Sequence, residues 1–316
     1  MNPFKQDRFQ GNLYKTKYFE GWYFKVLTKD KTNSLVLIPG ISLNKEKPHA
    51  FIQVFITNHL KQSMQTYYLT FDISHFSFQK HTFYISIKDN IFSKDFIFLN
   101  INQKNLKLIG KLHISNHHEI PSNLYQPNVM GPFAYIPFME CNHGILSMDS
   151  KVHGNLIYQE KKLDFDDTHM YIEKDYGKSF PSKYIWIQSN HFKQKNDAFM
   201  FSYATIPFLK FKFKGLIATL YANKKHYRFT TYNLSKTKID RINEHIVTIE
   251  IKKRKYRLII KATQADVVKL KSPYQGKMDH EIKEGLSGIV DIQLYKKKQL
   301  IFEDTGYYAG IEIMFD

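Results

Sequence analysis

The stretch that decides the fold class is residues 184–190, which read Tyr-Ile-Trp-Ile-Gln-Ser-Asn. If this stretch is a strand, its two isoleucines share one face, because alternate side chains of a strand point to opposite faces. The other face then carries aromatic and amide side chains, those of Tyr184, Trp186, Gln188 and Asn190. A strand of this kind suits a ligand cavity, since such cavities are mostly apolar with a few placed polar groups.

Short apolar or alternating runs of the same kind recur along the whole chain. They include 35–38, which stops at the turn dipeptide Pro39-Gly40, and 198–206, 247–251 and 256–262. The aromatic fraction of 16% fits strands, because aromatic side chains suit a pleated, half-buried surface. Many short strands about ten residues apart predict an all-β protein, built as a sandwich or barrel, with any helices peripheral.

The domain organisation is predicted from length and from one polar stretch. At 316 residues the chain exceeds one typical domain. Residues 159–168 are rich in Lys and Asp and have the composition of a loop, which predicts a boundary between domains 1–165 and 166–316. A faint echo between 49–54 and 197–202, each downstream of a Trp-bearing strand, indicates two related β halves.

The amino terminus and the cysteine count predict a cytoplasmic location. Residues 1–7 contain no apolar core of a signal peptide. No uncharged apolar run approaches the ~18 residues that a membrane span requires. Cys141 is the one cysteine and cannot form an internal disulfide, so a reducing compartment is expected.

The formal net charge is +17, and most of the basic residues are lysine. This balance predicts an anionic partner, although a lysine excess is also typical of an AT-rich genome. No recognition-helix or RNP-like motif accompanies the charge, so nucleic acid is not the expected partner. The sequence instead favours loose, peripheral contact with an anionic membrane through basic runs such as 252–255 and 296–298, where solvated turns are expected.

The first segment with chemical potential is residues 18–25, where Glu20, Trp22 and Phe24 would share one face of a strand. A carboxylate beside a large aromatic ring can line a pocket. The alternative is a first strand whose Trp fills the end of a barrel.

The second is residues 131–144, where dense Gly and Pro fix an unusual backbone path around Glu140, Cys141 and His143. On a strand Cys141 and His143 share a face, but their Cα atoms would be roughly 6–7 Å apart. A nucleophile–base pair needs hydrogen-bond reach, so a cysteine nucleophile is not expected. Glu140 is better suited to act as an acid or as a hydrogen-bonding anchor.

The third is residues 171–192, where Glu173 and Asp175 share a face if the segment is extended. Neighbouring carboxylates raise one another's pKa, so one of them can stay protonated and act as a general acid. The alternative is neutralisation by nearby lysines in a surface network. A weaker cluster, His113, His117, His118 and Glu119, has metal-like spacing but falls in a polar loop, so no metal is expected.

Four segments together resemble the tocopherol cyclase-like family. They are Glu20-Gly21-Trp22-Tyr23-Phe24-Lys25, residues 131–144, residues 171–192 and Glu284-Gly285-Leu286-Ser287-Gly288. The resemblance implies two tandem lipocalin-like antiparallel β-barrels, related to carotenoid hydratase-like proteins. It also implies an enzyme that protonates an alkene of a prenylated hydroquinone and closes a chromanol ring, with no redox cofactor or metal.

The roles that follow are assigned from residue chemistry within that resemblance. Asp175 or Glu140 is the expected acid, with Glu173 beside it, and Trp22, Tyr23 and Trp186 form the aromatic wall. Gln53, Gln188 and His191 hold the quinol hydroxyls, and His143 and Asn190 complete the ligand-binding set. Two alternatives remain open: a non-catalytic carrier of an apolar ligand (a quinone, isoprenoid or lipid), and a surface-interaction protein that uses its lysines.

Overall fold

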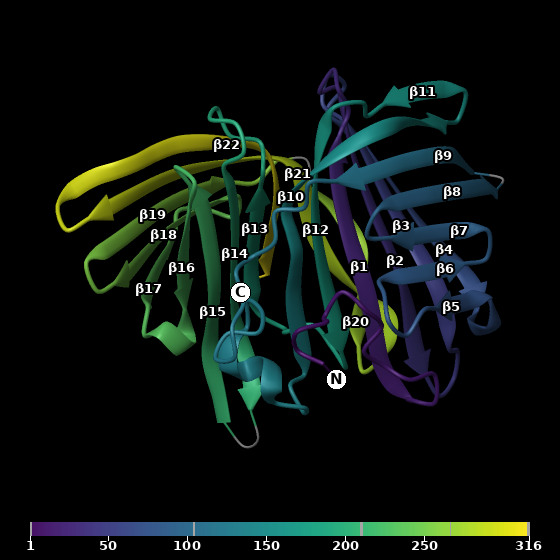
Figure 1. Cartoon of the computed structure of the whole chain (residues 1–316), viewed down its shortest axis with the longest axis horizontal. Helices are drawn as coiled ribbons and strands as arrows, with labels where there is room; N and C mark the ends of the chain where they lie inside the picture. The colour runs from purple at the N-terminus through teal and green to yellow at the C-terminus, as the bar shows by residue number, and fades with distance from the viewer. Residues whose placement is uncertain (1, 104, 209–210, 266, 315–316) are drawn as a thin grey trace. The chain divides into compact units, whose positions relative to one another are not determined.

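The computed structural model describes residues 2–103, 105–208, 211–265 and 267–314. Its chain divides into two compact units, each built on one large antiparallel sheet (Figure 1). The first unit contains residues 1–129, 133–180 and 271–280, and the second contains 130–132, 181–270 and 281–316. The predicted all-β class is confirmed. The predicted division at 165/166 precedes β12, whose strand lies in the sheet of the first unit.

The sheet of the first unit has twelve strands, ordered β4-β3-β2-β1-β12-β10-β9-β8-β7-β6-β5, with β11 paired to β10. Their bounds are β1 Lys17–Leu27, β2 Asn33–Asn44, β3 His49–Asn58, β4 Ser63–Asp72, β5 Phe76–Phe78, β6 Tyr84–Ile87, β7 Asn90–Ser93, β8 Phe96–Gln103, β9 Leu106–Ser115, β10 Cys141–Tyr158, β11 Lys161–Asp164 and β12 Thr168–Gly177. Two short 3₁₀ helices, Ile73–His75 and Gly131–Tyr135, lie between strands. The first strand thus pairs with β12, about 150 residues later, and this long-range pairing creates the site described below.

The sheet of the second unit has ten strands, ordered β16-β15-β14-β13-β22-β21-β19-β18-β17, with β20 paired to β21. Their bounds are β13 Tyr184–Ser189, β14 Ala198–Phe208, β15 Phe211–Ala222, β16 Lys225–Thr230, β17 Lys236–Arg241, β18 Ile246–Lys253, β19 Tyr256–Thr263, β20 Val267–Tyr274, β21 Lys277–Lys296 and β22 Gln299–Met314. A 3₁₀ turn, Thr231–Asn233, joins β16 to β17. Within the described residues no ladder joins the two edge strands of either sheet, so both sheets are open rather than closed barrels. In the same ranges no helix is long and apolar enough to cross a bilayer.

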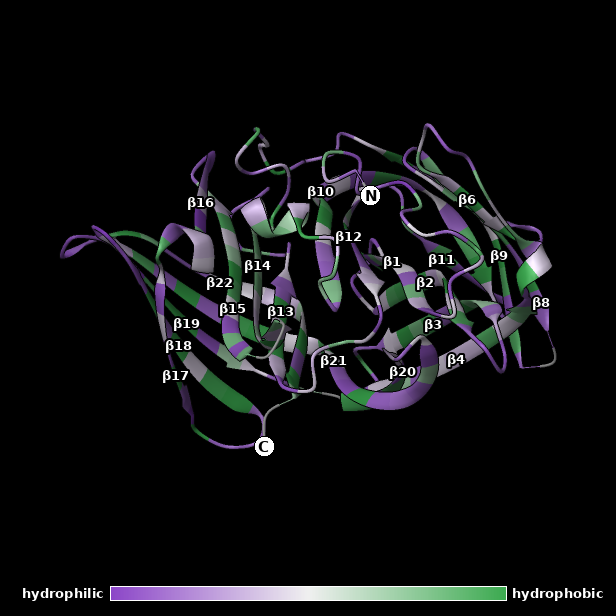
Figure 2. Cartoon of the chain, turned by 90° about the horizontal axis from the view of Figure 1, so that it is seen from below, coloured by the Kyte–Doolittle hydropathy of each residue, from purple (hydrophilic) through white to green (hydrophobic). Residues whose placement is uncertain are grey.

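Each sheet packs a hydrophobic core against one of its faces. Hydrophilic and hydrophobic residues alternate along many strands (Figure 2). The core of the first unit includes Trp22 and Phe24, as their predicted common face requires. The core of the second unit includes Ile185 and Ile187, which confirms the alternation predicted for residues 184–190. The aromatic and amide side chains of that strand therefore belong to the opposite face.

A buried ion pair holds the amino-terminal segment to the core face of the first unit. The side chains of Glu20 and Lys174 form this pair and are both fully buried. Glu20 also accepts hydrogen bonds from the N–H groups of Gln10 and Gly11, at 2.8 and 3.0 Å, and from the Tyr18 hydroxyl. These partners offset the cost of burying the charge. Glu20 is thus committed to structural contacts rather than to a ligand pocket.

Lys174 and Trp22 complete this anchor from the other side. The Lys174 ammonium donates to the carbonyl oxygens of Gln6, at 2.9 Å, and Arg8, and it lies 4.3 Å from the centre of the Trp22 ring. The Trp22 indole N–H donates to the carbonyl oxygen of Asp7 at 2.9 Å. Trp22 therefore belongs to the packed core of the first unit.

Candidate functional site

Three neighbouring strands, β1, β12 and β10, place chemistry on the face opposite the core of the first unit. In the register of the sheet, Asp175 lies between Gly21 and His143, and Glu173 lies between Tyr23 and Ile145. Alternation along β12 therefore sends Glu173 and Asp175 to one face, while Lys174, between them, points into the core. The predicted common face of the two carboxylates is confirmed.

His143 joins the two carboxylates into one cluster. Its Nδ1 atom lies 2.9 Å from Oδ1 of Asp175, and its Nε2 atom lies 3.5 Å from Oε2 of Glu173. The Tyr171 hydroxyl donates to the same Glu173 oxygen at 2.6 Å. The Glu173 side chain is 6% exposed and the Asp175 side chain 20% exposed, so Asp175 is the more accessible acid.

The cluster shifts the pKa of each group that it surrounds. Burial alone lowers the pKa of His143, but the carboxylates of Asp175 and Glu173 more than offset this and raise it to about 9. His143 is therefore an imidazolium at neutral pH. Burial, together with Glu173, raises the pKa of Tyr171 well above its ordinary value, so Tyr171 stays a hydrogen-bond donor.

Cys141 lies next to the cluster but is poorly suited to attack. Its Sγ atom is 3.8 Å from Oδ1 of Asp175. Burial and the negative charge of Asp175 raise the pKa of the Cys141 thiol well above its ordinary value. A protonated thiol is a weak nucleophile, in keeping with the expectation from sequence.

Glycine at position 177 holds the turn before β10 against the end of β12. Gly177 has a φ of 155°, and a Cβ atom there would lie 2.2 Å from the carbonyl oxygen of Glu140. That carbonyl accepts a hydrogen bond from the N–H of Lys178 at 2.7 Å. The main chain of Glu140 thus acts as an anchor, and the predicted role of its carboxylate as an acid stays a prediction.

Aromatic rings flank the carboxylates on the same face. Tyr23 and Tyr171 contact edge to face with ring centres 6.5 Å apart, and Phe19 and Phe180 do so at 5.4 Å. The negative faces of aromatic rings stabilise a nearby cation. The site therefore combines a hydrogen-bonded carboxylate cluster with a largely buried aromatic surround.

Residues 118–314 match the family model described as tocopherol cyclase-like, and this range contains His143, Glu173 and Asp175. The chain belongs to the tocopherol cyclase-like family. No curated protein sequence matches it significantly.

Solved structures of low sequence identity share the fold of this family member. The crystal structure of CghA aligns with a TM-score of 0.59 and 9% identity, over 95% of this chain and 89% of CghA. A protein assigned as AttH from Nitrosomonas europaea gives 0.55 and 12%, over 98% and 96%. Kievitone hydratase from Nectria haematococca gives 0.53 and 13%, over 98% and 92%. At these identities the likeness concerns the fold alone.

Two more residues predicted to bind ligand in this tocopherol cyclase-like chain lie in the first unit. Gln53 in β3 lies opposite Ile38 of β2, and the register of β2 with β1 places Ile38 beside Tyr23, which lies opposite Glu173. The Gln53 side chain is therefore on the same face of the sheet as the carboxylate cluster. Its side-chain amide exchanges hydrogen bonds with the main chain of Lys271, at 3.3 and 3.1 Å. Trp22 points the other way, into the core, because it is adjacent to Tyr23 on the strand.

The remaining predicted residues, Trp186, Gln188, Asn190 and His191, lie in the second unit. The Gln188 side chain donates to that of Asn190 at 3.3 Å, and both are buried. The His191 ring packs edge to face on Tyr308, with ring centres 5.9 Å apart. The structure therefore gathers the predicted residues into two groups, one per unit, and their binding roles remain predictions.

Some polar residues near these groups were not assigned roles from sequence. Tyr171 belongs to the first group, and its place in the alternation with Glu173 and Asp175 was the available signal. In the second unit Glu312 accepts a hydrogen bond from the Tyr184 hydroxyl and lies opposite Glu284 on the neighbouring strand. Both glutamates are buried, and both belong to motifs near the end of the chain. Their proximity depends on the pairing of β21 with β22, which the local sequence does not show.

One group of side chains has the geometry to hold a metal ion. Among the described residues, one ligand atom each from His143, Glu173 and Asp175 lies within 4.8 Å of the others. A metal on Nδ1 of His143 would have to replace the proton shared with Asp175. The weaker candidates from the 113–119 region are paired elsewhere: His117 with Ser150 at 3.0 Å and Glu119 with Lys94 at 2.8 Å.

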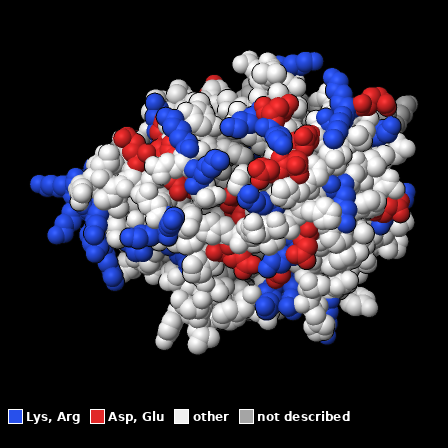
Figure 3. Space-filling view, turned by 45° about the horizontal axis from the view of Figure 1, so that its top comes forward, with Lys and Arg blue, Asp and Glu red and all other residues white. Residues whose placement is uncertain are grey.

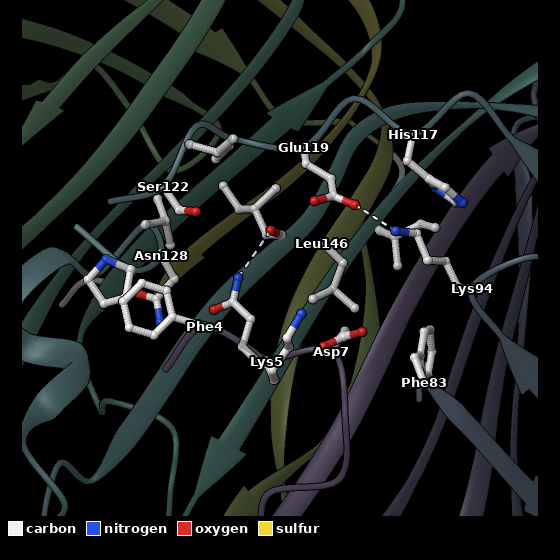
Figure 4. A pocket seen from close by; sticks show the side chains of 16 residues that line it. Phe4, Lys5, Asp7, Phe83, Lys94, His117, Glu119, Ser122, Asn128 and Leu146 are labelled. Carbon is white, nitrogen blue, oxygen red and sulfur yellow. Dashed lines mark hydrogen bonds and ion pairs between the residues drawn. The ribbon is translucent and has the colours of Figure 1, made fainter. Parts of the chain in front are cut away.

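A separate cavity of about 160 Å³ lies in the first unit between the amino-terminal segment and residues 117–129 (Figure 4). Lys94 and Glu119 pair along one side of it, with Lys5 and Asp7 nearby. None of the cluster residues His143, Glu173 and Asp175 is among the described residues that line this cavity. The cavity is therefore distinct from the candidate site.

Proposed function

We propose that this member of the tocopherol cyclase-like family is an enzyme that protonates an alkene of an isoprenoid substrate, with Asp175 as the proton donor. The observation that carries the proposal is the position of His143 between the carboxylates of Asp175 and Glu173, at 2.9 and 3.5 Å. Two carboxylates and one imidazolium leave a net charge of −1. To act as an acid, the cluster must carry one further proton on a carboxylate oxygen.

The accessible position for that proton is Oδ2 of Asp175. The hydrogen bonds of the Asp175 carboxylate, from His143 and weakly from Cys141, fall on Oδ1. Glu173 is less exposed and accepts from Tyr171. A substrate alkene would therefore meet Asp175 before Glu173.

The reaction proposed is an isomerisation that closes a ring. The proton on Oδ2 adds to one carbon of a trisubstituted alkene, and the other carbon becomes a tertiary cation. The phenol oxygen of a prenylated hydroquinone forms a C–O bond to that carbon, and the phenol proton returns to the carboxylate. Tyr23 and Tyr171 would stabilise the cation through their ring faces, and His143 would hold the carboxylate in place after it gives up the proton.

Capture by water instead of the phenol would give an alcohol by hydration. The same protonation step serves both outcomes, and a structural neighbour is named as a hydratase. We favour ring closure because the family model that matches is described as tocopherol cyclase-like. Product identity decides between the two.

The test is a deuterium-incorporation assay in D₂O with a prenylated hydroquinone, read by mass spectrometry. Wild type is compared with Asp175→Asn and with Asp149→Asn, a matched control. Asp149 is a buried carboxylate on β10 that also contacts a histidine, with His169 Nδ1 at 2.7 Å. A deuterated chromanol from wild type and Asp149→Asn, but not from Asp175→Asn, supports the proposal. Substrate that all three proteins retain unchanged would favour the carrier.

A further inference from the structure

A basic cleft lies in the second unit, formed by β16 and by the ends of β18, β19 and β21. Its volume is about 590 Å³. Five basic side chains line it, those of Lys225, His226, Arg228, Lys253 and Lys296, and in the described part of the chain no acidic residue does. The four lysine and arginine side chains around this hollow, with no carboxylate among its described lining residues, create a field that favours an anion.

Lys253 is held within this cleft. Its ammonium donates a hydrogen bond to the carbonyl oxygen of Arg228 at 2.8 Å, which ties the end of β18 to β16. Burial, with repulsion from Arg254 and Arg228, lowers the pKa of Lys253. The nearby acid Glu250 pairs instead with Lys252 at 3.0 Å and Arg257 at 3.5 Å. The ion pairs of Glu250 are thus made with Lys252 and Arg257 rather than with Lys253.

The positive charge continues outside the cleft. The turn between β18 and β19 exposes Lys252, Arg254 and Lys255, and the turn between β21 and β22 exposes Lys297 and Lys298, next to Lys296 of the cleft. Figure 3 shows blue side chains gathered at the end where these hairpins turn, on the left of the view. Positive charge that extends from the cleft over these two turns suits a broad anionic surface better than a single small anion.

Two tyrosines add a second feature of interfacial surfaces. Tyr227 and Tyr256 both line the cleft and contact edge to face, with ring centres 5.7 Å apart. Tyrosine has an apolar ring and a polar tip, and it is enriched where proteins meet the headgroup region of a bilayer.

We propose that this end of the second unit docks on an anionic lipid bilayer, with the cleft receiving the phosphate of a lipid headgroup. The inference concerns binding and is independent of the reaction at His143 and Asp175. The net charge predicts contact with an anionic membrane but not its location, and this proposal assigns the contact to the basic cleft and its neighbouring turns.

The test is co-sedimentation with phosphatidylcholine vesicles that contain no anionic lipid or about a third phosphatidylglycerol. The cleft variant is Lys225→Gln/Lys253→Gln/Lys296→Gln. The control is Lys47→Gln/Lys61→Gln/Lys80→Gln, which removes the same charge from exposed lysines of the first unit. At about 1 kcal/mol for each lysine near the surface, the cleft variant should lose roughly 100-fold in partitioning onto the anionic vesicles. The control should lose far less.

A second variant guards against misfolding, because Lys253 is partly buried and bonded to Arg228. Lys225→Gln/Lys296→Gln changes only exposed side chains and should lose roughly 30-fold. Circular dichroism and thermal melts establish that each variant folds.

A final arm separates lipid from soluble anions. Inorganic phosphate and soluble glycerophosphoglycerol are titrated by calorimetry at millimolar concentration. Binding to anionic vesicles that is lost in the cleft variants supports the proposal. Equal loss in the control would assign binding to overall charge and overturn it. Phosphate binding without vesicle binding, or binding to neither, would also overturn it.

Discussion

Two buried ionic groups lie on opposite faces of β12 and are built differently. On the core face, Lys174 and Glu20 are fully buried, and both are surrounded by hydrogen-bond partners from the main chain of residues 6–11. On the other face, His143, Glu173 and Asp175 form a cluster with an unequal number of positive and negative groups. The first arrangement pairs one positive group with one negative group, whereas the second places two carboxylates around one imidazole.

This difference separates a structural ion pair from a chemical site within three consecutive residues. Burial alone does not distinguish them, because Glu173, Lys174 and Glu20 are all buried. The number of hydrogen-bond and ion-pair partners around each charge distinguishes the two groups. Substitutions on the face of β12 that carries Glu173 and Asp175 should change the reaction rate with little effect on stability. Substitutions on the core face, which carries Lys174, should lower stability with little direct effect on the rate.

The largest expected effect is on rate, at Asp175. We expect Asp175→Asn to lower kcat about a thousandfold, because a positioned general acid contributes on this scale and an amide cannot donate the proton. Thermal unfolding should change little. A steady-state assay with a melt of the same preparation measures both. If Asp175→Asn retains activity, the face of β12 that carries Asp175 does not supply the acid, and the proposed difference between the two faces is wrong.

The next effect is on stability, at Lys174. We expect Lys174→Met to lower the free energy of unfolding by about 3–5 kcal/mol, because it leaves Glu20 buried without its counter-ion. Urea denaturation followed by fluorescence measures the change. Lys178→Met, an exposed lysine just beyond β12, is the control and should lie within about 0.5 kcal/mol of wild type. An equal loss of unfolding free energy in both variants would show that the Lys174–Glu20 pair contributes no more to stability than an exposed lysine does.

The pH dependence of stability should distinguish the two faces further. The pKa of His143 rises from an ordinary 6.5 to about 9 in the fold. Its raised pKa stabilises the protein fully below about pH 6.5, and this contribution, roughly 3 kcal/mol, declines as pH rises through 9. Denaturation of wild type and His143→Gln at pH 6 and pH 9.5 measures it. The gap between the two proteins should narrow at the higher pH, and a constant gap would contradict the assignment of the imidazolium.

The smallest effect is expected at Cys141. Its thiol is protonated and lies at the edge of the cluster, so Cys141→Ala should leave kcat nearly unchanged. Loss of a true nucleophile costs on the order of a millionfold. A collapse of activity with normal folding would place covalent chemistry at this position.

Local alternation made part of this structure predictable. The strand at 184–190, the shared face of Glu173 and Asp175, and the shared face of Trp22 and Phe24 all follow from the period of two along a strand. The same rule separates Trp22 from Tyr23, which the predicted aromatic wall placed together. The aromatic wall was predicted from residue type alone, without considering to which face of the strand each side chain points.

The partners of these strands were not predictable from local pattern. His143 meets Asp175 only because β10 pairs with β12 in one register, across 32 residues, and a slip of one residue would reverse every side chain. Lys174 reaches the carbonyl of Gln6 across 168 residues. Such contacts depend on the whole sheet rather than on neighbouring sequence.

The pairing of β1 with β12 also has a consequence for synthesis on the ribosome. β1 leaves the tunnel about 150 residues before its partner on one side exists. At typical translation rates this edge stays open for on the order of ten seconds. An apolar strand with an open edge invites pairing with other nascent chains. We therefore expect the edge of β1 to be a site of mispairing until β12 has emerged.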